Sequence, residues 1–159
     1  MTATTGTVRV LAATALAVAA GVVFASQPGA RPSASLTIRV RSFVVANSYH
    51  DTGVKGPSRG DVSIQRDRLV NVRRQFGKPI GATVGADMAR ITFRSATSAR
   101  VSGIADFPGG TVRFAGSAPL DTVATFRITG GTGRFAGASG HVVVGTGDSP
   151  LNVYTLLTL

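Results

Sequence analysis

From residue 36 onward, apolar and polar residues alternate with a period of two, the pattern of strands that bury one face and expose the other. The runs are rich in Val, Ile, Thr and Phe, which pleated surfaces prefer, and clusters of glycine and proline separate them. The pattern predicts eight strands, at residues 35–46, 61–67, 80–95, 99–106, 111–116, 122–129, 139–146 and 152–158.

Eight short strands with tight connections predict an all-β fold, either a sandwich or a closed barrel. The third run is long and contains Gly81 and Gly85. Glycine inside a strand marks a bend or a close backbone approach, as at the corner of a barrel. Closure also removes exposed strand edges. We therefore expect an eight-stranded antiparallel β-barrel.

The N-terminal segment has the features of a secretory signal. An uncharged, alanine-rich apolar run follows Arg9, and Val23 and Ala25 fit the small-residue rule for a cleavage site. The run is short for a membrane span, which takes about 20 strongly apolar residues; a retained anchor or a buried helix is the alternative. We expect a secreted, extracellular protein with no membrane contact after cleavage. The expected parts are a signal peptide at 1–25, a flexible lead-in at 26–35 and a barrel at 36–159.

The composition excludes several kinds of functional site. The net charge is +10, and glutamate and cysteine are absent, which excludes disulfides, thiol catalysis and zinc–thiolate sites. Basic residues are spread along the strands with no aromatic ladder, so they indicate a solvated outer face rather than a nucleic-acid site, with attraction to an acidic surface or ligand as the alternative. His50 and His141 lack a third ligand at metal spacing. We expect no metal, no cofactor and no nucleic-acid partner.

The sharpest local feature is the glycine-rich segment Ile128-Thr-Gly-Gly-Thr-Gly-Arg-Phe-Ala-Gly-Ala-Ser-Gly140. Glycine-rich loops can bind phosphate, but no Lys-Ser/Thr pair follows, and the glycine spacing does not match a dinucleotide fingerprint. The segment reads instead as a turn, in which Gly131 or Gly133 takes a positive φ. Residues 109–116 repeat residues 130–137 at a distance of 21 residues. Shared turn chemistry or an old duplication accounts for the repeat.

The same segment resembles the signature shared by allene oxide cyclases and dirigent proteins. A second match lies upstream, where Gly60-Asp61, Asp67-Arg68-Leu69, Gly77-Lys78-Pro79-Ile80-Gly81 and Gly85 follow in the family's order. The last strand, residues 154–159, is also similar, so the match covers residues 36–159. The resemblance implies an eight-stranded barrel with an apolar interior, often assembled as a homotrimer.

The departures from the family bear on function. Plant allene oxide cyclases place a glutamate and an asparagine on the first strand and a cysteine on the third around the cavity, and this chain has neither glutamate nor cysteine. Matching Gly81 and Gly85 to the family puts Asp87 where that cysteine stands. Asp87 is therefore a candidate ligand-binding residue, and a surface carboxylate paired with a nearby arginine is the alternative.

The register of the first strand decides what faces Asp87. A shift of one residue exchanges the two faces of a strand. One choice points Leu36, Ile38 and Val40 inward; the other points Thr37, Arg39 and Arg41 inward. In the second register, Arg39 and Arg41 join Asp87 as ligand-binding candidates.

An eight-stranded barrel can hold one small ligand, and such sites are mostly apolar with few polar groups. The resemblance implies a secreted barrel that binds a small apolar molecule and guides its cyclisation or stereoselective coupling. The alternative is a non-catalytic carrier, or a structural barrel filled by its own side chains. The residues leave open whether any reaction is catalysed.

Overall fold

In the computed structural model, residues 34–158 are described, and the expected signal peptide and nearly all of the lead-in lie outside them. This part is built of strands and one short 3₁₀ turn, η1 (Gly133–Phe135), and none of its helices is long and apolar enough to span a membrane. The strands are β1 (Ala34–His50), β2 (Val62–Asn71), β3 (Thr83–Ser95), β4 (Ser98–Phe107), β5 (Gly110–Pro119), β6 (Ala124–Gly131), β7 (Ser139–Val144) and β8 (Leu151–Thr158).

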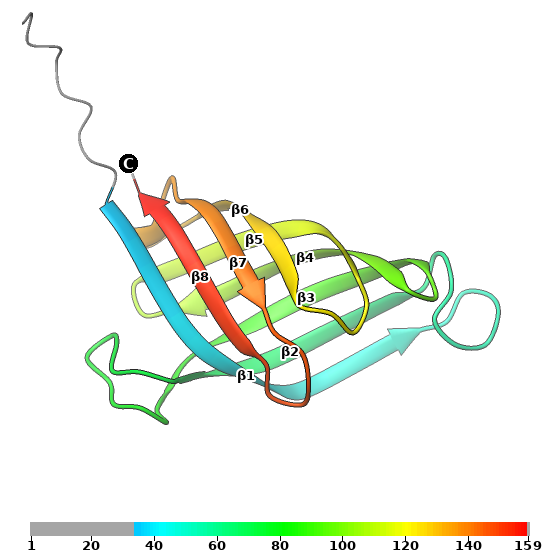
Figure 1. The fold of residues 1–159 in the computed structure, drawn as a ribbon, viewed down its shortest axis with the longest axis horizontal. Helices are drawn as coiled ribbons and strands as arrows, with labels where there is room; N and C mark the ends of the chain where they lie inside the picture. The colour runs from blue at the N-terminus through cyan, green and yellow to red at the C-terminus, as the bar shows by residue number, and fades with distance from the viewer. Residues whose placement is uncertain (1–33, 159) are drawn as a thin grey trace, which may run out of the picture. The chain divides into compact units, whose positions relative to one another are not determined.

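The eight strands form a closed antiparallel barrel (Figure 1). Each strand pairs with the next along the chain, and β8 pairs with β1 from Leu151↔Arg41 to Ala34↔Thr158. Every strand therefore has two hydrogen-bonded neighbours, and the barrel alternative is confirmed over the sandwich.

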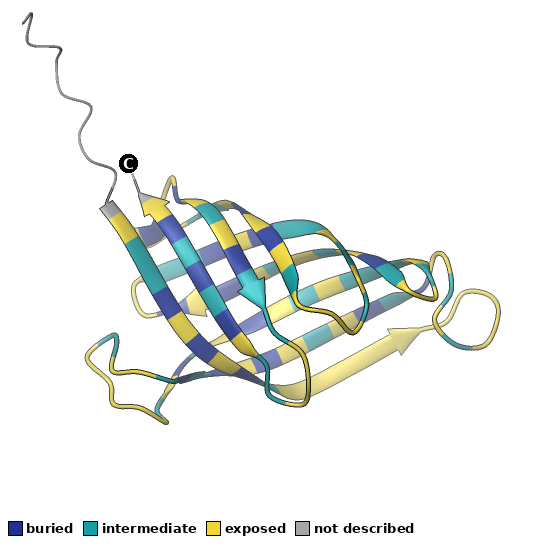
Figure 2. Ribbon diagram, viewed as in Figure 1, coloured by how far each residue is buried: buried dark blue, intermediate teal, exposed yellow. Residues whose placement is uncertain are grey.

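Strand β1 is longer than the alternation predicts, and its two halves have different partners. The first half pairs with β8 as far as Arg41, and the second pairs with β2 from Val40 to His50. The register shifts between Val44 and Ala46, and from Val44 onward the strand is exposed (Figure 2). With no buried face, this extension carries no inward-facing apolar positions that would have revealed it in the sequence.

The two glycines of the third run have different roles. Strand β3 begins at Thr83, so Gly81 lies in the preceding turn with φ of 81°, and its expected place inside the strand is wrong. Gly85 does lie in the strand, and a Cβ there would be 1.9 Å from the carbonyl oxygen of Asp106. The predicted close backbone approach is therefore confirmed at Gly85.

The two glycine-rich repeats lie against each other at one end of the barrel. Gly133 has φ of 57°, so the predicted positive φ is confirmed there. The amide of Thr132 donates to the carbonyl of Thr111 (3.0 Å), and the amide of Arg134 donates to Gly109 (2.8 Å). The repeat thus corresponds to two turns that interlock through their backbones.

Aromatic side chains fill the barrel at this end. Phe107 contacts three rings: it stacks on Phe76 at 5.6 Å between centroids and meets Phe135 (6.1 Å) and Tyr154 (5.2 Å) edge-on. We call this the closed end. At the opposite end the interior is hollow, so side chains fill only part of the barrel.

Candidate functional site

The observed register of β1 settles which side chains face inward. Ile38 and Val40 are buried in the barrel, whereas Arg39 and Arg41 are exposed on the outside. The guanidinium of Arg41 donates to the carbonyl of Ser149 instead (3.2 Å). The expectation that Arg39 and Arg41 face Asp87 is therefore wrong, because the register that buries the apolar set prevails.

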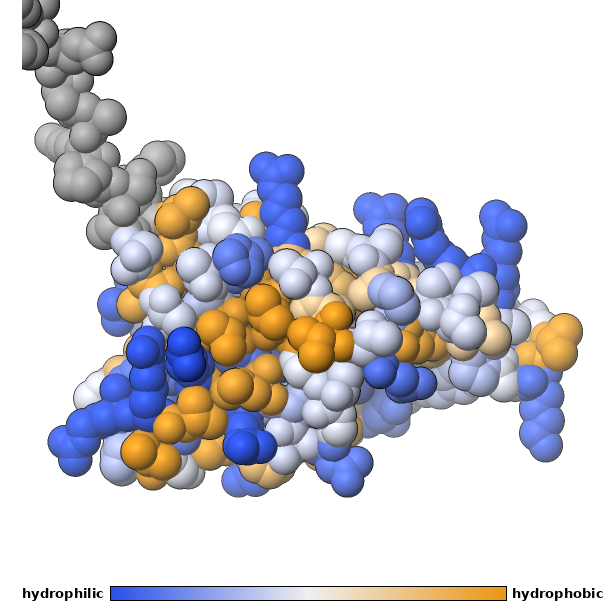
Figure 3. All heavy atoms as spheres, viewed as in Figure 1, coloured by the Kyte–Doolittle hydropathy of each residue, from blue (hydrophilic) through white to orange (hydrophobic). Residues whose placement is uncertain are grey.

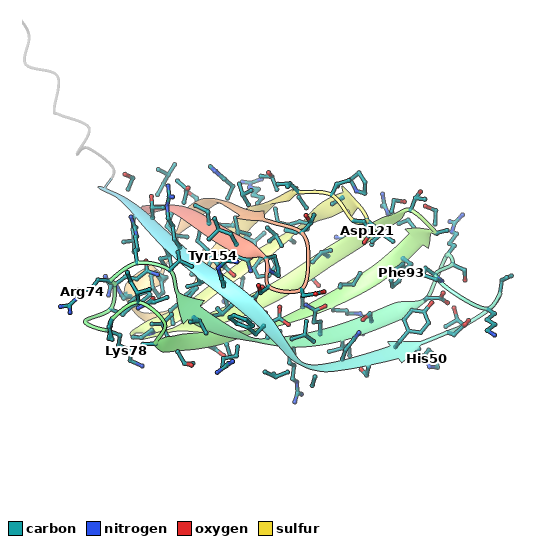
Figure 4. The ribbon with its side chains drawn as sticks, turned by 60° about the horizontal axis from the view of Figure 1, so that its bottom comes forward. His50, Arg74, Lys78, Phe93, Asp121 and Tyr154 are labelled. Carbon is teal, nitrogen blue, oxygen red and sulfur yellow. The ribbon has the colours of Figure 1, made fainter. Side chains whose placement is uncertain are left out.

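A cavity of about 310 Å³ occupies the hollow end of the barrel. The β5–β6 loop and the β7–β8 loop border its mouth, and Asp121 of the first loop lines it. Figure 4 places Asp121 at the end of the barrel opposite Arg74 and Lys78. The wall formed by β3 to β7 is mainly apolar, with lining residues Ala89, Ile91, Ala99, Val101, Phe114, Ala118, Ala124, Phe126 and Val144.

Two carboxylates line this cavity side by side. Asp67 on β2 pairs directly with Asp87 on β3, and their exposed fractions are 5% and 8%. Each lies on the inward face of its strand, in phase with Leu69 on β2 and Ala89 on β3. Two side chains at directly opposed positions lie about 5 Å apart at their Cβ atoms. The two acids therefore act as a coupled pair.

Burial changes the acidity of this pair. Desolvation raises the pKa of Asp87 to about 7, with a further contribution from the charge of Asp67, while the nearby Tyr154 hydroxyl acts in the opposite direction. Desolvation likewise raises the pKa of Asp67, against hydrogen bonds from Gln65 and Ser42. The amide of Gln65 donates to both Asp67 oxygens at 3.0 Å. Near neutral pH the pair therefore holds a proton that it can exchange with a ligand.

Two further polar groups from β8 line the cavity beside the acids. Tyr154 is fully buried and Asn152 is 3% exposed. Asn152 donates from Nδ2 to the Ser42 hydroxyl (3.2 Å). Within residues 34–158, Asn152 Oδ1 and Tyr154 Oη have no partner at hydrogen-bond geometry, although the Tyr154 hydroxyl is near enough to Asp87 to affect its pKa. Buried polar atoms are almost always paired, so two unpartnered polar atoms, both shielded from solvent, are an unusual feature of this wall of the cavity.

Among the other titratable residues, Asp61 and His50 lie outside the cavity. Asp61 is buried and accepts hydrogen bonds from Thr52 N (2.8 Å), Ser58 N (2.7 Å) and Tyr49 Oη (2.7 Å). The Thr52 backbone bond is the largest cause of a pKa well below the usual range for Asp61, and the bond to Asp61 raises the pKa of Tyr49 to about 12. Asp61 thus holds the β1–β2 loop, and His50 is exposed.

Sequence reasoning found one member of the cavity's polar set and missed the others. Asp87 was singled out by its place in the family pattern, whereas Asp67 was only part of a motif. The available signal was strand phase: Asp67 is two residues from Leu69, and both positions face inward. For Asn152 and Tyr154 the same alternation with Leu156 was the only indication.

Comparison with known proteins supports the fold. No family model matches the chain, and a search of curated proteins finds no match. Among solved structures, a pyocyanin demethylase is 24% identical with a TM-score of 0.63, over 76% of this chain and 99% of that one. The Diels-Alderase AbmU from Streptomyces koyangensis is 17% identical with a TM-score of 0.63, over 79% of this chain and 64% of that one. The pterocarpan synthase dirigent protein GePTS1 is 16% identical with a TM-score of 0.54, over 77% and 87%.

These identities are low, and what they establish is the architecture. Barrels of the same kind occur in proteins described as Diels-Alderases and as dirigent proteins. The resemblance predicted from the glycine motifs is thereby confirmed at the level of the fold: the chain has a closed eight-stranded barrel like those of these dirigent proteins and Diels-Alderases.

Proposed function

We propose that this barrel binds a small, mainly apolar molecule in its open half and guides the molecule's cyclisation or coupling. The observation that carries the proposal is the cavity itself, in which two facing carboxylates and the Tyr154 hydroxyl meet an apolar wall. An apolar wall with a few convergent polar groups is the usual composition of a small-molecule site. A barrel filled throughout by its own side chains would lack this space.

The cavity can contribute to a ring closure in two ways. The apolar wall holds a flexible ligand in a folded conformation, which removes much of the entropy cost of bringing the reacting atoms together. The acid pair holds a proton at Asp87 near neutral pH, and a protonated carboxyl can donate to an oxygen on which charge develops. The neighbours described as Diels-Alderases and as a pterocarpan synthase make the same kind of reaction a reasonable assignment here.

A stereochemical experiment tests this proposal. The purified chain is incubated with a panel of diene and dienophile pairs that react slowly in buffer and differ in the charge of one substituent. Chiral chromatography measures the enantiomeric excess of the adducts. We expect an excess for at least one pair that fits the cavity, and its reduction in Asp87→Asn and Tyr154→Phe.

Asp106→Asn provides the matched control, because Asp106 is exposed on the outer face of β4. This variant should keep the full enantiomeric excess. Racemic products at the buffer rate from every pair, although the pairs bind, would leave a carrier without chemistry. Racemic products without binding would remove the small-molecule function altogether.

A further inference from the structure

The polar part of the cavity is rich in acceptors, and its donors are hydroxyl groups and the proton that the acid pair holds near neutral pH. Asp67 and Asp87 contribute carboxylate oxygens, and Asn152 adds an Oδ1 atom that is unpartnered but shielded from solvent. The nearby amide donors are already engaged, since Gln65 bonds Asp67 and Asn152 Nδ2 bonds Ser42. Once the acid pair has lost its proton, a ligand that carries donors of its own complements this patch best.

The charge of the lining has a single sign, which contrasts with the rest of the molecule. Its ionisable carboxylates are Asp67, Asp87 and Asp121, and within residues 34–158 the lining includes no Arg, Lys or His. The chain as a whole carries a net charge of +10. Arg41, whose guanidinium donates to the carbonyl of Ser149, does not line the cavity. Such a lining repels an organic anion and attracts a cation.

The apolar wall suits the same kind of ligand. Phe114 and Phe126 both line the cavity, with ring centroids 6.1 Å apart and planes tilted by 33°. Aromatic faces attract cations through their quadrupole and also provide apolar contact area. The cavity volume of about 310 Å³ lies at the lower end of the usual range for ligand pockets, which suits a compact ligand.

We propose that the ligand is a small apolar molecule bearing a protonated nitrogen, with the nitrogen seated at the acid pair, Asp67 and Asp87. This inference rests on the proposed function and specifies its substrate class. It distinguishes this barrel from one that would take a fatty acid or another carboxylate, because such a group would face the two acids without a cation to balance it.

Three probes with one apolar body test the charge preference: 2-naphthylmethylammonium, 2-naphthylmethanol and 2-naphthoate. Isothermal titration calorimetry with the full chain at pH 8 gives their dissociation constants. We expect the ammonium to bind at least about tenfold more tightly than the alcohol, and the naphthoate to bind most weakly. Asp87→Asn and Asp67→Asn should each reduce this preference about tenfold while changing the affinity for the alcohol less than threefold. Asp106→Asn, which places the same change on the outer face, should alter neither.

The pH dependence provides a second measurement. The titratable groups that line the cavity are Asp67 on β2, Asp87 on β3, Tyr154 on β8 and Asp121 in the β5–β6 loop. The affinity for the ammonium should increase from pH 5.5 to pH 8 as the acid pair loses its proton, while the affinity for the alcohol stays level. If the alcohol or the naphthoate binds as tightly as the ammonium, the proposed ligand class is wrong and the small-molecule function stands. If no probe binds, both proposals fail.

Discussion

At the residue scale, the informative feature is a carboxylate kept inside a barrel without a cationic partner. The sequence indicated Asp87 through its position in the family pattern, and the structure places it in the cavity. Two registers were open for the first strand, and the one that would have placed Arg39 and Arg41 beside Asp87 is not observed, because both side chains are exposed. The ambiguity has a physical origin. The alternation shows that one face of β1 is buried, but it does not say which face. The observed strand points the apolar residues Leu36, Ile38 and Val40 inward and the charged ones outward.

The buried acid should make the fold less stable as pH rises. The pKa of Asp87 is about 7 in the folded protein against about 3.9 for an unperturbed aspartate. Between these values the folded state binds more protons than the unfolded state, so the free energy of unfolding falls with increasing pH. The fall attributable to Asp87 is on the order of 4 kcal/mol between pH 4 and pH 8.

Asp87→Asn removes this titration and should be more stable than the wild type at pH 8, with a smaller difference at pH 4.5. Urea denaturation at the two pH values measures the change. Asp106→Asn again serves as the exposed control and should follow the wild type. Equal pH dependence in Asp87→Asn and the wild type would show that Asp87 is ionised at no cost in the folded protein.

At the scale of single elements, the strands were predictable and their ends were less so. The period-two pattern located all eight strands, because each barrel strand has one apolar inward face. It ended β1 at residue 46 instead of His50, since the extension beyond Val44 has no buried side. It also included residues 80–82 in β3, although Gly81 belongs to a turn.

The glycine-rich turn provides a test at this scale. Gly133 and Gly137 both have positive φ, at 57° and 74°. A Cβ on Gly133 would be 2.1 Å from the carbonyl oxygen of Gly109, whereas one on Gly137 would meet nothing within 4 Å. Gly137→Ala should therefore cost only the backbone strain, about 1 kcal/mol. Gly133→Ala should cost about 2–4 kcal/mol, because the interlocked turn must also move.

Thermal melting of the two variants measures this difference. The comparison separates conformational strain from the contact between the two turns, since both variants carry the same side chain. Equal melting temperatures for Gly133→Ala and Gly137→Ala would show that the close approach to Gly109 contributes nothing to stability.

At the scale of the whole molecule, the outer surface bears on assembly. Figure 3 shows a band of apolar side chains across the face in view, together with polar and basic side chains over the β2–β3 loop. On the outside of β2 to β4, Ile64, Met88 and Ile104 are exposed and line one groove. Exposed apolar patches of this kind are typical of protein–protein contacts.

We propose, as the family resemblance implies, that copies of the barrel assemble as a homotrimer through the apolar groove on the outside of β2 to β4. Analytical ultracentrifugation of the purified chain should then give three times the mass of one chain. Met88→Arg places a charge in the apolar groove and should shift the mass toward one copy. Thr129→Arg, a change at the edge of the same groove, should have a smaller effect. A monomeric wild type at high micromolar concentration would contradict the proposal.

Export is the remaining property of the whole chain, and we propose that the barrel acts outside the cell after removal of residues 1–25. Cleavage after Ala25 would leave β1 (Ala34–His50) and its closing pairs with β8 in the mature chain. Intact-mass analysis of material from the culture medium should give a chain that begins at Ser26. Replacement of the small residue at the cleavage site, Ala25→Phe, should leave the longer chain with the cells, since signal cleavage requires a small side chain there. Wild-type protein recovered only from membranes with Met1 still attached would instead favour a retained anchor, which would leave the cavity unchanged but restrict it to ligands that reach the membrane surface.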